Sequence, residues 1–477
     1  MSRILVIDDE QAIGWSLREL LGDDGHSVEI AADIDGGMTI GRRFRPEAVM
    51  LDVRLGKRDG LAALPDLRAA IGDVPVVVMT AFGDLDTAVR AVQAGAVDYL
   101  LKPFDLEKVS QVVARVLADR GTQAPVAAGE PAVPPPPGRI VGSSPPMQEV
   151  FKQIALVAPT DLPVLITGET GTGKELAARA IHAHGPRRDG PFVATNLAAL
   201  APGVVESELF GHVRGAFTGA ATDRPGLFDM AAGGTLLLDE IGEASADVQA
   251  KLLRVLEMHE VTPVGSASSH PVDVRVIAAS NRDLSVACSA GSFRTDLHHR
   301  IRGFPITMPS LAERTGDIEP LARHFLAAFF ARQGSMPRGD LLSSEFLDAI
   351  AKRPWPGNVR ELRHAVEYAA VQARGGLLRP EHLPPRTSDA GPSSGGPIEA
   401  TAAAVASAVK AWSAAARLAF GDLPEPDLHR RAVDLLDATL LRETLAHCGG
   451  NRTAAAKLLG LDRATLRTRL RLLGLDD

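Results

Sequence analysis

The order of apolar and polar positions divides the first 120 residues into alternating strands and helices. Short apolar runs at 3–8 (RILVID), 48–53 (AVMLDV), 74–81 (VPVVVMTA) and 98–103 (DYLLKP) predict buried strands. Between them, QAIGWSLRELL and LDTAVRAVQAG carry apolar residues at helical spacing. Because strands that alternate with helices form parallel sheets covered on both faces, we expect a doubly wound α/β domain here.

A second α/β pattern and a helical segment follow, separated by stretches without apolar periodicity. Residues 121–138 are rich in Pro, Ala and Gly and predict an extended linker, and 384–397 have the composition of a flexible tether. We therefore expect domains at 1–120 and 139–383 and a compact helical unit at 429–477. The intervening residues 384–428 include an Ala-rich predicted helix at 400–420, for which the sequence indicates no partner.

Composition limits the class of protein. A chain of 477 residues has room for two to four domains. The formal net charge of −8 means that any surface for nucleic acid must be local. Two distant cysteines, Cys288 and Cys448, argue against a disulfide framework. Because no long apolar run is present and the N-terminus reads as a buried strand, we expect a cytoplasmic protein with no membrane partner.

Acidic and basic residues follow the predicted strands of the first domain. Asp8 and Asp9 follow the first strand, Asp52 and Thr80 end later ones, and Lys102 follows the last. Since the carboxyl ends of parallel strands share one edge of a sheet, these five side chains should meet. Clustered carboxylates repel one another unless a cation lies between them, and hard oxygen ligands suit Mg²⁺. A set of unrelated surface acids is the simpler alternative, but it does not account for this combination of residue types.

Residues 1–120 resemble the response-regulator receiver family, which has a flavodoxin-like fold. The resemblance implies that Asp52 accepts a phosphoryl group from a cognate histidine kinase. It implies Mg²⁺ coordination by Asp9, Asp52 and the Arg54 carbonyl, assisted by Asp8. Thr80, Tyr99 and Lys102 are then the switch residues that respond to phosphorylation. Gly56 departs from the proline common at that position in the family.

The segment GETGTGKE at 168–175 lies between the apolar strand LPVLIT and the helical pattern LAARAIHA. This strand–loop–helix context is what a phosphate-binding P-loop requires. Its glycines let backbone N–H groups approach phosphates, and Lys174 adds a positive charge. Glu175 stands where the general pattern has a hydroxyl ligand for Mg²⁺. The expected nucleotide-binding residues are Gly168, Glu169, Thr170, Gly171, Thr172, Gly173, Lys174, Glu175 and, from further along the chain, Arg360.

An acid pair ends the second predicted strand of this domain, GGTLLLDE. We expect Asp239 to hold Mg²⁺ and Glu240 to polarise the attacking water, as a general base must. Phosphoryl transfer also needs positive charge delivered to the γ-phosphate. Arginines that could supply it flank TDLHH and lie in WPGNVREL, although a single arginine is more often a solvated surface residue.

Residues 139–383 resemble the AAA+ core of bacterial sigma-54-dependent activators, the NtrC family of enhancer-binding proteins. The motifs GETGTGKE, ELFGHVRGAFTGA, GGTLLLDEI, FPITMPSLAER and WPGNVREL occur in the family's order. The resemblance implies a helical lid from about residue 317 and an assembly from dimer to hexameric ring that binds ATP between subunits. It also implies these roles: Arg294 and Arg300 as fingers toward the neighbouring subunit, Arg360 and Asn281 as sensors, and Asn196 as the partner that holds Glu240.

The hexapeptide GAFTGA at 215–220 places a bulky phenylalanine between glycines. Glycine favours neither helix nor strand, so the segment predicts a loop. Phe217 either packs into the core of its own domain or is an exposed anchor for a partner. The family resemblance favours the second alternative and names sigma-54 as the partner. The contact residues are then Gly215, Ala216, Phe217, Thr218, Gly219 and Ala220.

Positive charge concentrates at the C-terminal end. Residues 429–477 contain 9 Lys or Arg and 6 Asp or Glu, a net charge of +3 in a chain of net −8. A short helix at 453–460 and a second helix after Asp462 predict a helix-turn-helix with a basic recognition helix. The segment resembles the Fis-type DNA-binding domain, and the candidate DNA contacts are Arg463, Thr465, Arg467 and Thr468.

These features together predict a phosphorylation-controlled transcription activator. It binds upstream DNA and uses ATP hydrolysis in a ring to remodel sigma-54 RNA polymerase. Two other classes remain open: an AAA+ unfoldase acting on protein substrates, and a DNA-binding regulator with a vestigial ATPase. An unfoldase needs neither a receiver nor a helix-turn-helix, and a vestigial ATPase has no reason to keep Lys174 and the acid pair. The sequence leaves open the signal, the target operons and the direction in which phosphorylation acts.

Overall fold

The computed structural model describes residues 1–56, 58–81, 83–118, 140–217, 220, 222–334 and 340–385. Near the C-terminus it describes 438, 441–442, 444–445, 448, 451–458 and 463–472. The predicted linker at 121–138, the predicted helix at 400–420, Thr218 and Gly219 lie outside these ranges. The chain forms two compact units, Met1–Pro384 and Pro385–Asp477.

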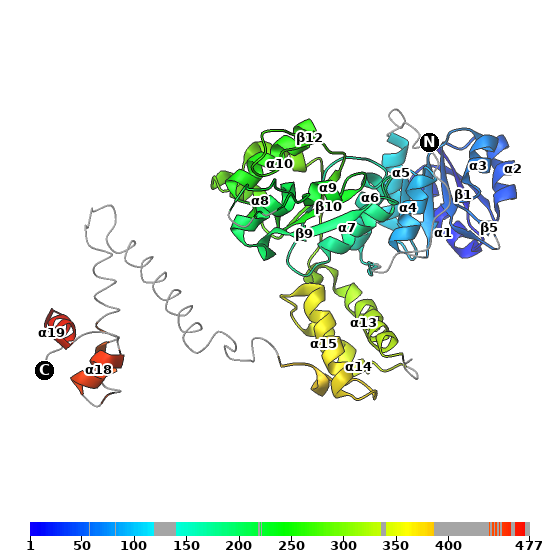
Figure 1. Cartoon of the computed structure of the whole chain (residues 1–477). Helices are drawn as coiled ribbons and strands as arrows, with labels where there is room; N and C mark the ends of the chain where they lie inside the picture. Colours follow the sequence, from blue (N-terminus) through cyan, green and yellow to red (C-terminus); the bar gives the residue numbers. More distant parts are fainter. Residues whose placement is uncertain are drawn as a thin grey trace, which may run out of the picture. The chain divides into compact units, whose positions relative to one another are not determined.

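The N-terminal domain contains the predicted doubly wound parallel sheet (Figure 1). Its strands lie in the order β2 (Ser27–Ala31), β1 (Arg3–Ile7), β3 (Ala48–Asp52), β6 (Val76–Thr80) and β7 (Asp98–Leu101). The helices are α1 (Gln11–Asp23), α2 (Ile34–Phe44), α3 (Leu64–Ile71), α4 (Leu85–Gln93) and α5 (Leu106–Ala118). Alternate residues of β1 enter two separate cores, Ile4 and Val6 on one face and Leu5 and Ile7 on the other. Both faces of the sheet are therefore covered. A small hairpin, β4 (Arg54–Leu55) and β5 (Arg58–Asp59), follows β3.

The middle domain has a second parallel sheet of five strands. The order is β14 (Phe304–Thr307), β8 (Val164–Thr167), β13 (Arg275–Ser280), β10 (Thr235–Asp239) and β9 (Phe192–Asn196). The surrounding helices are α6 (Pro145–Val157), α7 (Lys174–Ala183), α8 (Pro202–Phe210), α9 (Leu227–Met230), α10 (Ala246–Met258), α11 (Leu284–Ser289) and α12 (Thr295–Ile301). A short hairpin joins β11 (Glu260–Val261) to β12 (His270–Pro271). The strand ends that carry the predicted site residues all lie at one edge of this sheet.

A helical subdomain follows the second sheet, as expected. The 3₁₀ segment η3 (Leu311–Asp317) leads into α13 (Ile318–Arg332), α14 (Ser344–Lys352) and α15 (Asn358–Gln372). These helices enclose a hydrophobic core of their own, which includes Phe346, Trp355 and Leu362. The subdomain therefore has a hydrophobic core separate from the cores of the two sheets.

The first two domains share a buried contact that the sequence did not predict. Helix α6 packs against α4, and apolar residues of both domains, such as Val89 and Phe151, belong to one continuous core cluster. The sequence indicated only an extended linker at 121–138 between these domains. Because a linker's composition says nothing about the surfaces on either side of it, this contact was not accessible from the sequence.

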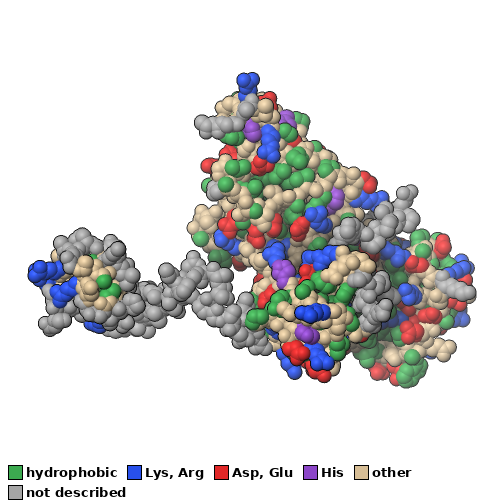
Figure 2. Space-filling model, turned by 60° about the horizontal axis from the view of Figure 1, so that its bottom comes forward, with side chains coloured by type: hydrophobic (Ala, Val, Ile, Leu, Met, Phe, Trp, Pro, Cys, Tyr) green, Lys and Arg blue, Asp and Glu red, His purple; other side chains and the backbone are tan. Residues whose placement is uncertain are grey.

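In the C-terminal unit, α18 (Arg452–Leu458) packs against α19 (Arg463–Leu472). Leu466 and Leu470 of α19 are buried together with Ala455 and Ala456 of α18. Arg467, Arg469 and Arg471 are exposed. The described Lys and Arg side chains of this unit stand out in blue at the left of Figure 2. Within the described parts of the chain, no helix is both long enough and apolar enough to cross a bilayer.

Candidate functional site

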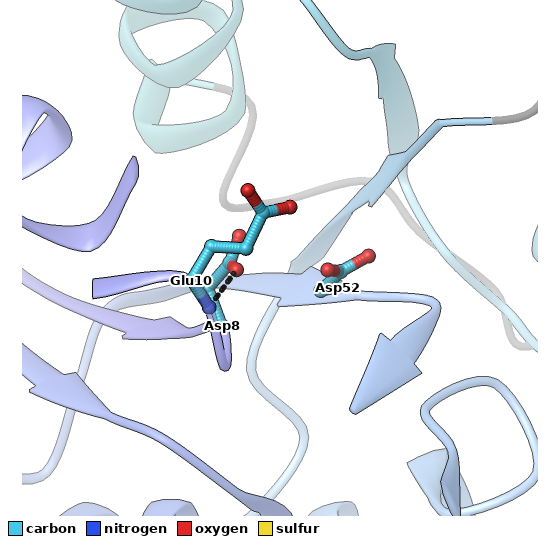
Figure 3. A group of neighbouring side chains, drawn as sticks. All are labelled: Asp8, Glu10 and Asp52. Carbon is cyan, nitrogen blue, oxygen red and sulfur yellow. Dashed lines mark hydrogen bonds between the residues drawn. The ribbon is translucent and has the colours of Figure 1, made fainter. Parts of the chain in front are cut away.

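The acidic cluster of the N-terminal domain lies at the carboxyl ends of β1 and β3 (Figure 3). Carboxylate oxygens of Asp8, Glu10 and Asp52 lie within 4.8 Å of one another. Asp8 and Asp52 are buried, and Glu10 is exposed. Burial raises the pKa of Asp8 despite its contacts with Lys102. Three carboxylates at this spacing are a suitable ligand set for Mg²⁺.

Lys102 extends from the loop after β7 into this cluster. Its Nζ lies 2.7 Å from Asp52 Oδ2 and 2.8 Å from Asp8 Oδ2. Burial lowers the pKa of this ammonium, but the two carboxylates outweigh that effect and the pKa is raised. Lys102 therefore stays positively charged, and it can hold a phosphoryl oxygen on Asp52. Thr80, also buried, ends β6 beside it, and its carbonyl accepts from the Lys102 backbone N–H.

The carboxylates that meet at this site differ by one residue from the predicted Mg²⁺ ligands. Asp9 accepts a hydrogen bond from the Gly56 backbone N–H at 2.9 Å, and Glu10 joins Asp8 and Asp52 in its place. The side chains of successive residues after a strand leave in different directions, so a run of three acids does not reveal which of them converge. The role of Asp9 as a ligand stays a prediction.

Tyr99, the expected switch aromatic, is 4% exposed and contacts the middle domain. Its hydroxyl donates toward Gln148 of α6, with the backbone oxygen at 3.0 Å and Oε1 at 2.9 Å. The Gln148 amide in turn donates to the Gly83 carbonyl at 2.8 Å. Beside this pair, Lys152 Nζ lies 2.5 Å from Asp98 Oδ1. Burial raises the pKa of Tyr99, so its phenol remains a hydrogen-bond donor.

The P-loop connects β8 to α7, as predicted. Gly168, Gly171 and Gly173 all have positive φ, which glycine adopts without the strain that a side chain would add. Lys174 is buried, and its Nζ donates to the Gly168 carbonyl at 2.8 Å and to the Glu169 carbonyl at 3.2 Å. Burial lowers the pKa of Lys174, and nearby Glu240 and Asp239 act in the opposite direction.

Two other residues of the predicted nucleotide site differ in orientation. The Glu175 carboxylate accepts from the Arg179 guanidinium at 2.7 Å, one helical turn along α7. Arg360 lies at the start of α15, and its charge contributes to the lowered pKa of Lys174. The Glu175 carboxylate is therefore paired on the surface of α7, whereas the charge of Arg360 acts on Lys174.

The acid pair ends β10 beside the P-loop. Glu240 has a left-handed backbone, with φ of 54°, and its Oε2 accepts from the Asn281 backbone N–H at 3.1 Å. The Asn281 amide donates to Thr170 Oγ1 at 3.3 Å. Asn281 therefore joins the acid pair to the P-loop.

Asn196 makes a different contact from the one expected. Its Nδ2 donates to Asp239 Oδ2 at 3.2 Å, and no described contact joins it to Glu240. The register explains this pairing, because Asn196 of β9 and Asp239 of β10 are direct neighbours in the parallel sheet. The left-handed backbone at Glu240 turns that side chain toward Asn281 instead.

Both candidate finger arginines are engaged within their own chain. Arg294 forms a bidentate ion pair with Asp296, with Nη2 2.7 Å from Oδ2. Arg300 donates to the Leu256 carbonyl and lines a cavity of about 350 Å³. This cavity lies where the strands begin, since Pro163 and Gly303 line it, and thus opposite the P-loop. The Arg294–Asp296 pair is solvent-exposed on both sides, and the role of Arg294 toward another chain stays a prediction.

The described residues of the GAFTGA segment, Gly215, Ala216, Phe217 and Ala220, lie in neither a helix nor a strand and follow α8. Phe217 is 47% exposed, and its only described ring contact is with His212, edge-on at 5.0 Å. Gly215, at φ of 84°, and the hydrogen bond from its N–H to the Ala220 carbonyl close the loop. In this structure Phe217 is therefore not a core residue. Thr218 and Gly219 lie outside the described residues.

Of the candidate DNA contacts, Arg467 and Thr468 are exposed on α19 and Thr465 is half-buried. The side chain of Arg463 lies outside the described residues. Leu466 and Leu470 of the same helix are buried, whereas Arg467, Arg469 and Arg471 are exposed.

Four family models match successive parts of the chain. They are the response regulator receiver domain (4–114), the sigma-54 interaction domain (140–307), the AAA+ ATPase lid domain (312–398) and the Fis family of bacterial regulatory proteins (432–472). Over 470 residues, 98% of each chain, the sequence is 39% identical to the transcriptional regulatory protein ZraR of Salmonella typhimurium. The chain belongs to the sigma-54-dependent response regulators.

A second curated regulator and one solved structure are also similar to the chain. The DNA-binding transcriptional regulator NtrC of Rhizobium meliloti is 39% identical over 480 residues, which cover 99% of this chain and 97% of NtrC. The crystal structure of NtrX from Brucella abortus in complex with ATP is 30% identical, covers 99% of both chains and has a TM-score of 0.49. The family assignment confirms a two-component response regulator with a flavodoxin-like receiver, an ATP-binding AAA+ domain with a helical lid, and a Fis-type DNA-binding domain. The sigma-54 AAA+ domain also implies ATPase activity.

Proposed function

We propose that this protein opens promoters by coupling ATP hydrolysis to remodelling of sigma-54 RNA polymerase, under control of phosphorylation at Asp52. The observation that carries the proposal is the exposed Phe217 on a loop of the same domain that assembles the P-loop and acid pair. An apolar side chain held out on a loop favours a partner-binding role. Promoter opening in vitro by the full chain, dependent on ATP and on sigma-54, tests the whole proposal.

In this function each site residue has a chemical task. Lys174 and the P-loop amides bind the ATP phosphates, and Asp239 holds the Mg²⁺ that accompanies them. Glu240 orients and deprotonates the attacking water. Arg294, on an exposed surface, supplies positive charge to the nucleotide of a neighbouring chain in a ring. The basic face of α19 holds the ring at upstream DNA.

The alternative functions are separable by the same assay. An unfoldase hydrolyses ATP without dependence on sigma-54 or a promoter. A regulator with a vestigial ATPase activates transcription without ATP turnover. The intact pairing of Asn281 with Glu240 and the buried Lys174 support an active ATPase site.

Phosphorylation of Asp52 should replace its carboxylate charge with that of a phosphoryl group, which Lys102 can hold and toward which Thr80 can turn. Asp52→Asn is expected to remove all stoichiometric labelling by a radioactive acyl-phosphate donor, because an amide is not a nucleophile of this kind. The change is nearly isosteric, so the receiver should remain folded, which circular dichroism checks. Labelling that persists at one phosphoryl group per chain would reassign the acceptor.

The contact between Tyr99 and Gln148 supports a direction for this control. It buries the switch aromatic against α6 in the unphosphorylated chain, so the receiver restrains the AAA+ domain until Tyr99 is released. We expect Gln148→Ala to raise basal ATP turnover and to weaken its further stimulation by acetyl phosphate, because two hydrogen bonds to the receiver are lost. The steady-state turnover rate with and without acetyl phosphate measures both effects.

Gln153→Ala is the matched control for this variant. Gln153 lies on the same helix, and among the described contacts its side-chain oxygen has no hydrogen-bond partner. It should leave both rates unchanged. If Gln148→Ala also leaves basal turnover and its stimulation unchanged, the docked receiver does not restrain the ATPase.

A further inference from the structure

The P-loop is attached to the lid through its own backbone. Three successive P-loop carbonyls each accept a hydrogen bond from the lid side: Thr170 from Asn358 Nδ2 (3.1 Å), Gly171 from the Arg360 N–H (3.3 Å) and Thr172 from Arg314 Nη2 (2.8 Å). The donors belong to η3 and to the first turn of α15. In a P-loop the N–H groups face the phosphates, so donors on the carbonyls fix the direction of the phosphate-binding amides.

Asn358 is the central residue of this attachment. It is 1% exposed and has a φ of 51°, a conformation that asparagine tolerates better than most residues. Its Oδ1 accepts from the Leu311 backbone N–H at 2.7 Å, and its Nδ2 donates to Glu169 Oε2 at 2.9 Å as well as to Thr170. One side chain therefore bonds to the start of η3 and to both a side chain and the backbone of the P-loop.

There is no free space between the two elements. A Cβ atom added at Gly171 would lie 2.3 Å from the Gly357 carbonyl oxygen, closer than any real Cβ contact. Gly171 also has a φ of 81°. The lid backbone thus touches the P-loop backbone, and any rotation of α15 must either move the P-loop or break these hydrogen bonds.

We propose that Asn358 is a positioning residue that makes nucleotide binding depend on the lid: its amide holds the P-loop in the shape that receives phosphates. The proposal rests on the ATPase function proposed above and deepens it. Through Asn358, binding of a nucleotide to the P-loop fixes the angle of α15, and a lid held at another angle lowers nucleotide affinity.

The variant that tests this is Asn358→Asp. Aspartate has nearly the same size, tolerates positive φ and keeps an oxygen for the Leu311 N–H. It loses the two donors to the P-loop and places a carboxylate beside that of Glu169. We expect the KM for ATP and the dissociation constant of a fluorescent ADP analogue each to rise about tenfold or more, as for a lost buried hydrogen bond. The kcat at saturating ATP should change much less.

A second substitution separates positioning from general damage. Glu169→Gln supplies an amide that can donate to the new carboxylate, which reverses the direction of the original hydrogen bond. The double variant Asn358→Asp/Glu169→Gln should therefore bind ADP more tightly than Asn358→Asp alone. A glutamine oxygen at position 169 can still accept from Asn358 Nδ2, so Glu169→Gln by itself should weaken ADP binding much less than Asn358→Asp does. A lid that is merely unstable would not regain ADP affinity through a second substitution at Glu169.

Asn451→Asp is the matched control, because the same change is made in the other compact unit, where an aspartate can still accept from the Thr453 N–H. It should bind ADP as the wild type does. If Asn358→Asp binds ADP with wild-type affinity, the positioning role of Asn358 is wrong while the ATPase proposal stands. The same holds if the double variant binds ADP no more tightly than Asn358→Asp alone. If the wild-type chain itself neither binds ADP nor hydrolyses ATP, both proposals fall.

Discussion

Glu240→Gln is expected to bind ATP with near wild-type affinity and to hydrolyse it about 100-fold more slowly or worse, since it lacks the general base. Glutamine keeps the size of the side chain and an oxygen that can accept from the Asn281 N–H, so the local geometry should survive. It cannot take a proton from water. Steady-state ATP turnover and equilibrium nucleotide binding, measured on the same preparation, separate these two properties.

Glu243→Gln is the matched control for this loss. Glu243 lies in the next turn and forms an ion pair with Arg282 at 2.7 Å, on an exposed surface where such pairs contribute little. Its removal should leave turnover unchanged. If Glu240→Gln keeps turnover within about threefold of wild type, the effect is too small for loss of a general base and another group activates the water.

The local sequence pattern was sufficient to predict the strands that are buried along their whole length. The strands β1, β3, β6, β8 and β10 are nearly continuous apolar runs, because each has a helix layer on both faces. The edge strand β2 carries Glu29 and is only partly buried, so its pattern is weak and it was not predicted. Helix α6 was also missed: it begins with two prolines, which suit the first turn of a helix but favour a loop when they are considered alone.

The positions of the site residues followed from topology, but their partners did not. Placing Asp8, Asp52 and Lys102 together required only that parallel strands end at one edge. In contrast, Asn358 meets the P-loop across 188 residues, and Tyr99 meets Gln148 across 49. Such contacts depend on the angle at which a lid or a domain packs. Which of two adjacent acids accepts a given hydrogen bond, as Asp239 rather than Glu240 does from Asn196, depends on backbone dihedral angles. The sequence does not reveal these angles.

Phe217→Ala is expected to keep ATP hydrolysis, oligomerisation and DNA binding but to lose open-complex formation by about tenfold or more, as removal of an aromatic anchor does at other interfaces. The structure supports this separation of effects. Phe217 touches only the His212 ring among described aromatic contacts, and the loop is closed by backbone hydrogen bonds at Gly215 and Ala220, which the substitution leaves in place. Removal of the ring therefore leaves no cavity in the core.

The decisive measurement is all four activities on one preparation of Phe217→Ala, beside Met258→Ala. Met258 is a still more exposed apolar side chain of the same domain, at the end of α10, and its truncation should leave all four activities intact. If Phe217→Ala unfolds the domain, the phenylalanine is a core residue after all. If it opens sigma-54 promoters at the wild-type rate, the loop is not the element that couples ATP hydrolysis to the polymerase. In a ring the same anchor recurs in every subunit, so weak single contacts add to strong binding, and one substitution per chain removes all of them at once.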